Sequence, residues 1–140
     1  MEKYRLLKNE ATADIAFKAY GRDLSELFEN VAVAISNIMV FKIKKEGDVK
    51  INFRLHGKNV DYLLIDFINK ILLYKDYKGV IVTNVKVKID KNLNLYCSAN
   101  AEKLEKLKSR FLVDVKAATL HDFGIKKEKE LIICKIVLDV

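Results

Sequence analysis

The stretch of sequence that decides the fold is residues 23–40, DLSELFENVAVAISNIMV. Its apolar side chains recur at steps of three and four residues, which places them in one stripe along a helix. The members of this stripe are Leu24, Leu27, Phe28, Val31, Ile35, Ile38 and Met39. Asp23 can cap the start of the helix, and Glu26 stands at the capping-box position three residues later. The pattern predicts an amphipathic helix with one buried face.

A second apolar stripe predicts a second helix near residues 59–76, with Asn59 as its cap. The stripe consists of Val60, Leu63, Leu64, Phe67, Ile68, Ile71 and Leu72. Just before this helix, apolar residues occupy every second place from Val49 to Leu55, which is the period of a β-strand. Gly57-Lys58 is expected to end that strand.

The rest of the chain is rich in strand patterns. Residues 85–89 and 93–97 are expected to pair as a hairpin across Asp90-Lys91-Asn92, and residues 102–109 to form a short charged helical turn. Another strand is expected to begin with Val113, Val115 and Ala117, and residues 131–138 are apolar enough to lie centrally in a sheet. Hairpins outnumber possible crossovers, so residues 1–140 are predicted to form a single α+β domain. Its two main amphipathic helices should pack on one side of a largely antiparallel β-sheet.

Composition limits the classes of protein that fit. The chain has 140 residues, of which 51% are hydrophobic, which suits one domain with a sizeable core. It has no apolar run long enough to span a membrane and no secretory signal pattern, so we expect a cytoplasmic protein. The 26 basic and 19 acidic residues give a net charge of +7, which favours encounters with nucleic acid or an acidic partner without specifying either.

The two cysteines, Cys97 and Cys134, each lie within an apolar run and lack the CxxC spacing of a zinc or redox site. Cysteine behaves as a small apolar residue in such positions. Both are expected to be buried in the core, and a zinc site is excluded.

Two blocks place polar groups where the strand pattern alone would not. The first is residues 10–21, EATADIAFKAYG, in which Asp14 interrupts an alternating pattern although aspartate is rare within strands. The second is residues 115–121, VKAATLH, which is followed after a hairpin by residues 136–140, IVLDV. The end of that segment puts Asp139 next to the carboxylate of Val140.

These blocks resemble the archease family. The likeness is carried by Thr12-Ala13-Asp14-Ile15, by Ala19-Tyr20-Gly21, by Lys116-Ala117 with Thr119 and His121, and by Leu138-Asp139-Val140. It continues into both predicted helices, through Glu29 and Asn30 in the first and Leu63-Leu64 with Asp66-Phe67 and Asn69 in the second. Two positions depart from the family pattern, because Ala11 replaces the family's histidine and Ala16 replaces a frequent glycine.

The resemblance implies a site for a divalent cation, usually calcium, with Asp14, Asp139 and an oxygen of Val140 as ligands. These hard oxygen donors suit calcium or magnesium. Carboxylates brought close together would also repel one another without a cation between them. From residue type alone the alternative is that Asp14 caps a turn and Asp139 is solvated at the chain end. Lys116, Thr119 and His121 are expected to face a partner, although a lone histidine is more often structural.

The resemblance also implies a function without catalysis on this chain. Archeases are accessory proteins of the RtcB-type RNA ligase that joins tRNA halves, and they promote its guanylylation and multiple turnover. Two alternatives stay open, which are a stand-alone RNA-binding module and a metal-dependent phosphoesterase. Against the first, aromatic residues are not interleaved with basic ones along one strand, so RNA should meet this chain only indirectly. Against the second, His121 is the only convincing general base.

Overall fold

The computed structural model describes residues 1–7, 14–43 and 46–140, the last with residues 120–123 described by their backbone. Within these ranges two long helices are present, α1 (Leu24–Met39) and α2 (Val60–Lys78). The short helix α3 (Leu104–Leu107) runs into one 3₁₀ turn (Lys108–Arg110). The strands are β1 (Tyr4–Leu7), β2 (Ile15–Gly21), β3 (Val49–His56), β4 (Val80–Ile89), β5 (Asn94–Lys103), β6 (Ala117–Glu128) and β7 (Leu131–Asp139).

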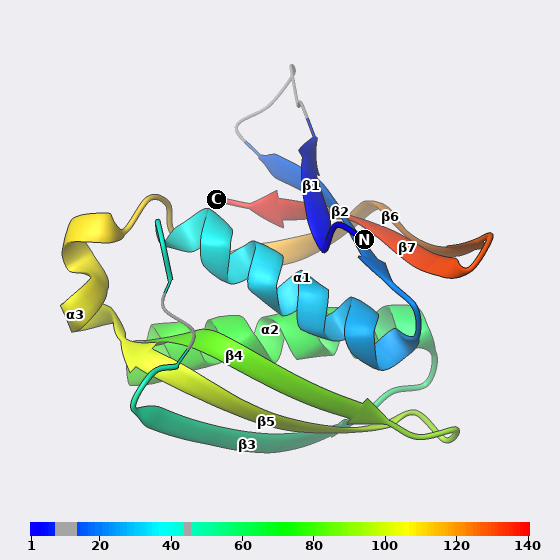
Figure 1. Ribbon diagram of the computed structural model, residues 1–140, viewed down its shortest axis with the longest axis horizontal. Coiled ribbons are helices and arrows are strands. Elements are labelled where there is room, and N and C mark those ends of the chain that lie inside the picture. Colours follow the sequence, from blue (N-terminus) through cyan, green and yellow to red (C-terminus); the bar gives the residue numbers. More distant parts are fainter. Residues whose placement is uncertain (8–13, 44–45) are drawn as a thin grey trace.

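The strands form two antiparallel sheets, and the two long helices lie between them (Figure 1). One sheet has the order β1-β2-β7-β6 and the other the order β3-β5-β4. The predicted α+β class and the antiparallel pairing are confirmed, as is the central place of residues 131–138. The difference is that the helices contact two sheets, α1 against both β2 and β4, where one sheet was expected. No helix in the part of the chain that the structure describes is long and apolar enough to cross a membrane.

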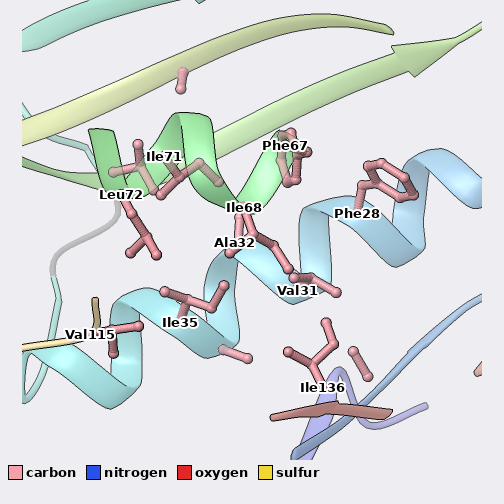
Figure 2. Close-up of a cluster of buried hydrophobic side chains, with 14 of the residues drawn as sticks. Phe28, Val31, Ala32, Ile35, Phe67, Ile68, Ile71, Leu72, Val115 and Ile136 are labelled. Carbon is pink, nitrogen blue, oxygen red and sulfur yellow. The ribbon is translucent and has the colours of Figure 1, made fainter. Parts of the chain in front are cut away.

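The core is built mainly from the facing stripes of α1 and α2 (Figure 2). Phe28 of α1 lies 5.4 Å from Phe67 of α2, and Phe67 lies 6.1 Å from Phe53 of β3, measured between ring centroids. Ile136 of β7 closes the same cluster from the opposite sheet (Figure 2). Burial of both helix stripes against two sheets therefore holds the layers together.

The start of α1 confirms the predicted cap and corrects the capping box. The Asp23 carboxylate accepts a hydrogen bond from the Glu26 N–H at 2.8 Å. The Glu26 carboxylate reaches one residue further back than expected and accepts from the Arg22 N–H at 2.9 Å and from the Arg22 guanidinium. In α2, Asn59 caps as predicted by accepting from the Tyr62 N–H at 2.9 Å.

The junction between β2 and α1 explains part of the family-like pattern. A side chain on Gly21 would overlap the backbone of Leu27, so the turn admits only glycine without a shift. The buried amide of Asn30 donates to the Tyr20 carbonyl at 2.7 Å, which ties α1 to the end of β2. Tyr20, Gly21 and Asn30 therefore set the angle at which the first helix leaves the sheet.

Of the remaining predicted elements, one differs from the structure. The hairpin across residues 90–92 is confirmed, and the charged helical turn is present as α3 and the 3₁₀ turn. The strand expected from Val113 is wrong, because residues 112–116 join no ladder and β6 begins at Ala117. This segment is bound elsewhere: the Leu112 N–H donates to the Met39 carbonyl at 2.7 Å, and Lys75 donates to the Val115 carbonyl.

Both cysteines are buried, as predicted. Cys97 lies on the inner face of β5 and Cys134 on the core side of β7. Burial raises the pKa of each thiol to about 12, so both stay protonated at neutral pH. They behave as small core residues and not as nucleophiles or metal ligands.

Candidate metal site

The pairing of β2 with β7 brings the two predicted aspartates to the same end of one sheet. Ile15 is the register partner of Leu138, and the ladder continues through Ala16 and Val137. The ladder ends at Ile15 and Leu138, and Asp14 and Asp139 are the next residue on each side of that last pair, with 124 residues between them in the sequence. Directly opposed residues of an antiparallel pair have Cβ atoms roughly 4.5–5.5 Å apart. Figure 1 shows the C-terminal end of β7 beside the start of β2.

The alternation of the two strands decides which face carries the aspartates. Phe17 and Ile136 point to the core and are fully buried. Residues Asp14 and Asp139 stand two positions away from the pair formed by Ala16 and Val137, on the opposite face from the helices. Asp139 is exposed and Asp14 is half-buried. The carboxylates therefore lie at a surface that solvent or a partner protein can reach.

The neighbouring strand β6 holds the last residues of β7 in place. Ala117 is the register partner of Asp139, and the Lys116 N–H donates to the Asp139 carbonyl at 2.8 Å. The half-buried side chain of Val140 packs against the core. The backbone of Asp139 is thus hydrogen-bonded to the segment that begins β6.

The three residues expected to face a partner lie on β6 or directly before it, and their surroundings differ. Thr119 is half-buried and its hydroxyl donates to the Val137 carbonyl at 3.4 Å, while the Lys116 side chain is exposed. His121 lies in the irregular part of β6 between Thr119 and Gly124, where the register with β7 shifts. The family position occupied by Ala11 lies outside the described residues, together with Thr12 and Ala13.

The chemistry of this donor set fits an oxygen-preferring cation. Two carboxylates lie at the same end of the β2–β7 ladder, and the main-chain oxygens of Val140 follow directly after Asp139. Across the described ranges, no group of three or more His, Cys, Asp or Glu side chains is arranged to hold a metal. A cation here would need an oxygen of Val140 as its third protein ligand, with water or a partner supplying the rest.

The buried lysine Lys75 was missed by the sequence-based reasoning. Its side chain is only 3% exposed; it donates to the Val115 carbonyl at 2.7 Å and pairs with Asp114 and Asp76. Lys75 thereby holds the segment that leads to Lys116 and so to Asp139. A signal was present, because position 75 continues the apolar stripe of the second helix by one more helical step after Ile71 and Leu72.

Comparisons with known proteins agree on one family. The model of the Archease protein family matches residues 4–140. The archease of Sulfurisphaera tokodaii is 35% identical over 141 residues, which cover 100% of both chains. The archease of Pyrococcus furiosus is 35% identical over 121 residues, covering 84% of this chain and 85% of that protein.

Solved structures support the same fold. The solution structure of protein 1598 from Methanobacterium thermoautotrophicum is 29% identical, with a TM-score of 0.76 over 100% of both chains. A crystal structure from Thermotoga maritima, described as an archease and possible chaperone, has a TM-score of 0.67 over 96% of both chains. At 19% identity the second likeness concerns the fold alone.

Proposed function

Because the chain belongs to the archease family, we propose that it is a non-catalytic activator of the RtcB-type RNA ligase of tRNA splicing. In this role it promotes guanylylation of the ligase and lets one ligase molecule complete many reactions. Its place of action is the cytoplasm.

The observation that supports the proposal is the pairing of β2 with β7, which brings Asp14 and Asp139 to the same end of the four-stranded sheet. A divalent cation, calcium by preference, binds there through both carboxylates and an oxygen of Val140. Calcium takes six to eight oxygen ligands, so three protein ligands leave several positions for water, a phosphate or a carboxylate of the partner. An anionic group of the ligase or of its nucleotide can then fill the remaining ligand positions of the bound cation.

The chain's own residues make this end suitable for docking. Asp139 is exposed and Asp14 half-buried, so the two carboxylates can be reached from solvent. Thr119 lies on the adjoining strand β6, Lys116 directly precedes that strand, and His121 lies in its irregular part. The ligase is expected to contact this strand while the cation is shared between the two proteins.

Calcium binding to the isolated protein tests the metal site. Titration calorimetry should show weak binding, with a dissociation constant on the order of 10⁻⁴–10⁻³ M, because much of the shell is water. Asp14→Asn and Asp139→Asn should each weaken binding by roughly tenfold or more, since each removes a ligand charge. The matched control is Glu105→Gln, which removes the same charge from an exposed position on α3.

Calcium binding that is equally tight in all three variants would contradict the metal site.

The same site can be tested in the complex by passing the protein and the ligase together over a sizing column. Co-elution should persist with calcium and weaken when the cation is removed by a chelator.

A further inference from the structure

The outer face of the three-stranded sheet is open. In Figure 1 the long helices lie on one side of β3, β5 and β4, and no helix or strand of the described residues covers the other side. The register aligns three cross-strand rows of outward side chains. The rows are Lys50-Asn100-Asn84, Asn52-Ser98-Lys86 and Arg54-Tyr96-Lys88. All of these residues except Asn100 are exposed.

Within the three rows of this face the charges have one sign, and the acidic Asp90, hydrogen-bonded to Asn94, lies just beyond them. Lys50, Arg54, Lys86 and Lys88 lie on this face, and the three rows contain no Asp or Glu. None of these four cations forms an ion pair with another residue of the described ranges. Four unpaired cations on a flat surface create a positive potential that attracts a polyanion.

One aromatic ring lies on the central strand of these rows, between two of the four cations. Tyr96 is 45% exposed and stands between Arg54 and Lys88 on the neighbouring strands. The Arg54 guanidinium carbon lies 5.9 Å from the centre of the Tyr96 ring. The ring borders a shallow hollow of about 460 Å³ that is also lined by Asn52, Arg54, Lys86, Lys88 and Ser98. The hollow combines a flat apolar surface, cations and neutral hydrogen-bonding groups.

We propose that this face, here called the Tyr96 face, binds single-stranded RNA. Lys50, Arg54, Lys86 and Lys88 contact phosphates, and one unpaired base stacks on Tyr96. An acidic peptide would use the cations but has no base to place on the ring, and a duplex keeps its bases out of reach of a flat sheet. The choice of RNA over DNA rests on the proposed function, which sets this chain beside RNA.

The proposal replaces the expectation that RNA meets the chain only indirectly. That expectation rested on the absence of alternating aromatic and basic residues along any one strand. On this face the aromatic residue and the basic residues lie side by side on three neighbouring strands, and this arrangement depends on how β3, β5 and β4 pair. The Tyr96 face and the carboxylates belong to different sheets. One molecule can therefore hold RNA while its other sheet meets a protein.

The test is the affinity of the isolated protein for a fluorescent 12-nucleotide single-stranded RNA, measured by anisotropy at several salt concentrations. Four phosphate contacts predict that log K falls with log salt with a slope of about −3. Tyr96→Ala should weaken binding roughly five- to 150-fold, and Tyr96→Phe should retain it, because phenylalanine keeps the stacking surface. Lys88→Gln should reduce the slope by about 0.7. The control Lys126→Gln removes the same charge from the exposed part of β6 in the other sheet and should leave the slope unchanged.

Three results would overturn the proposal. One is equal affinity of the wild-type protein and a Tyr96→Ala variant with an unchanged thermal melt. Another is equal loss in Lys88→Gln and Lys126→Gln, which would mean that only net charge matters. The third is equal or tighter binding of poly-glutamate, of the duplex form or of DNA of the same sequence. None of these assays contains the ligase or a metal, so their failure leaves the proposed function standing.

Discussion

Glu26 connects a local hydrogen-bond pattern to a measurable dependence on pH. Its carboxylate accepts hydrogen bonds from the Arg22 side chain and backbone, and these bonds lower the pKa of Glu26 to about 2 from an ordinary value of 4.5. Because the folded-state pKa is lowered, Glu26 stabilises the fold fully above the unfolded-state value. That stabilisation is lost as the pH falls from about 4.5 through about 2.

Glu26→Gln should therefore destabilise the protein at pH 7 and have little effect near pH 2. Urea unfolding at a series of pH values checks this, with Glu105→Gln, which removes an exposed carboxylate from α3, as the control. The Arg22–Glu26 pair lies near the surface, so the difference at pH 7 should also shrink in high salt. A difference that stayed constant from pH 7 to pH 2 would refute this origin of the stabilisation.

The sequence alone singles out the two individual residues of the candidate site, Asp14 and Asp139. Asp14 stood out because a carboxylate is unusual in a strand, and Asp139 stood out by its place in the closing segment. Their juxtaposition could not be derived from the residues alone, because it depends on β2 choosing β7 as its partner. Only the family resemblance linked the two positions before the register was known.

At the scale of elements, Lys75 joins α2 to the segment before β6. Its ammonium group donates to the Val115 carbonyl at 2.7 Å and pairs with Asp114, while its stem is buried. Removing the side chain leaves a buried carbonyl without a partner and a space in the core. Such losses cost more than an exposed ion pair because water cannot replace the lost contacts fully.

Lys75→Ala should lower the free energy of unfolding by about 2 kcal/mol. Asp114→Asn should cost less than about 1 kcal/mol, because the Asp114 side chain is 57% exposed and water can replace it. Denaturant unfolding measures both, and the exposed Lys78→Ala serves as the control, within about 0.5 kcal/mol of the wild type. If Lys75→Ala had the same free energy of unfolding as the control, the contacts of Lys75 with Val115 and Asp114 would not stabilise the fold.

Element prediction succeeded where periodicity alone decides the structure. Both helix stripes and both caps at Asp23 and Asn59 were evident from spacing. The segment from Val113 misled, because its alternation matched a strand although its hydrogen bonds go to Met39 and Lys75. Alternation shows which side chains face inward but not whether a neighbouring strand is present to complete a ladder.

At the scale of the whole molecule, one helix layer serves two sheets with different surfaces. The four-stranded sheet carries Asp14 and Asp139 at one end, and the three-stranded sheet carries the basic Tyr96 face. The sequence patterns predict the α+β class correctly, but they do not predict that the strands divide into two sheets. Strand periodicity does not name the partner of a strand, and the division into β1-β2-β7-β6 and β3-β5-β4 depends on long-range pairing.

The two surfaces give the molecule a division of labour. The proposed function assigns the carboxylate end to the ligase and a shared cation, and the further proposal assigns the Tyr96 face to a single strand of RNA. Substitutions on one sheet should leave the function of the other intact, since the sites share no residue.

The measurement that tests the central claim most directly is ligation by the RtcB-type ligase with a small amount of this protein added. The wild-type chain should convert a single-turnover reaction into a multiple-turnover one. Asp14→Ala and Asp139→Ala should each remove most of that stimulation without unfolding the protein, and deletion of Val140 should reduce it as well. Lys91→Ala, in the exposed turn between β4 and β5, should have little effect. Stimulation that survives the loss of both aspartates would contradict the account.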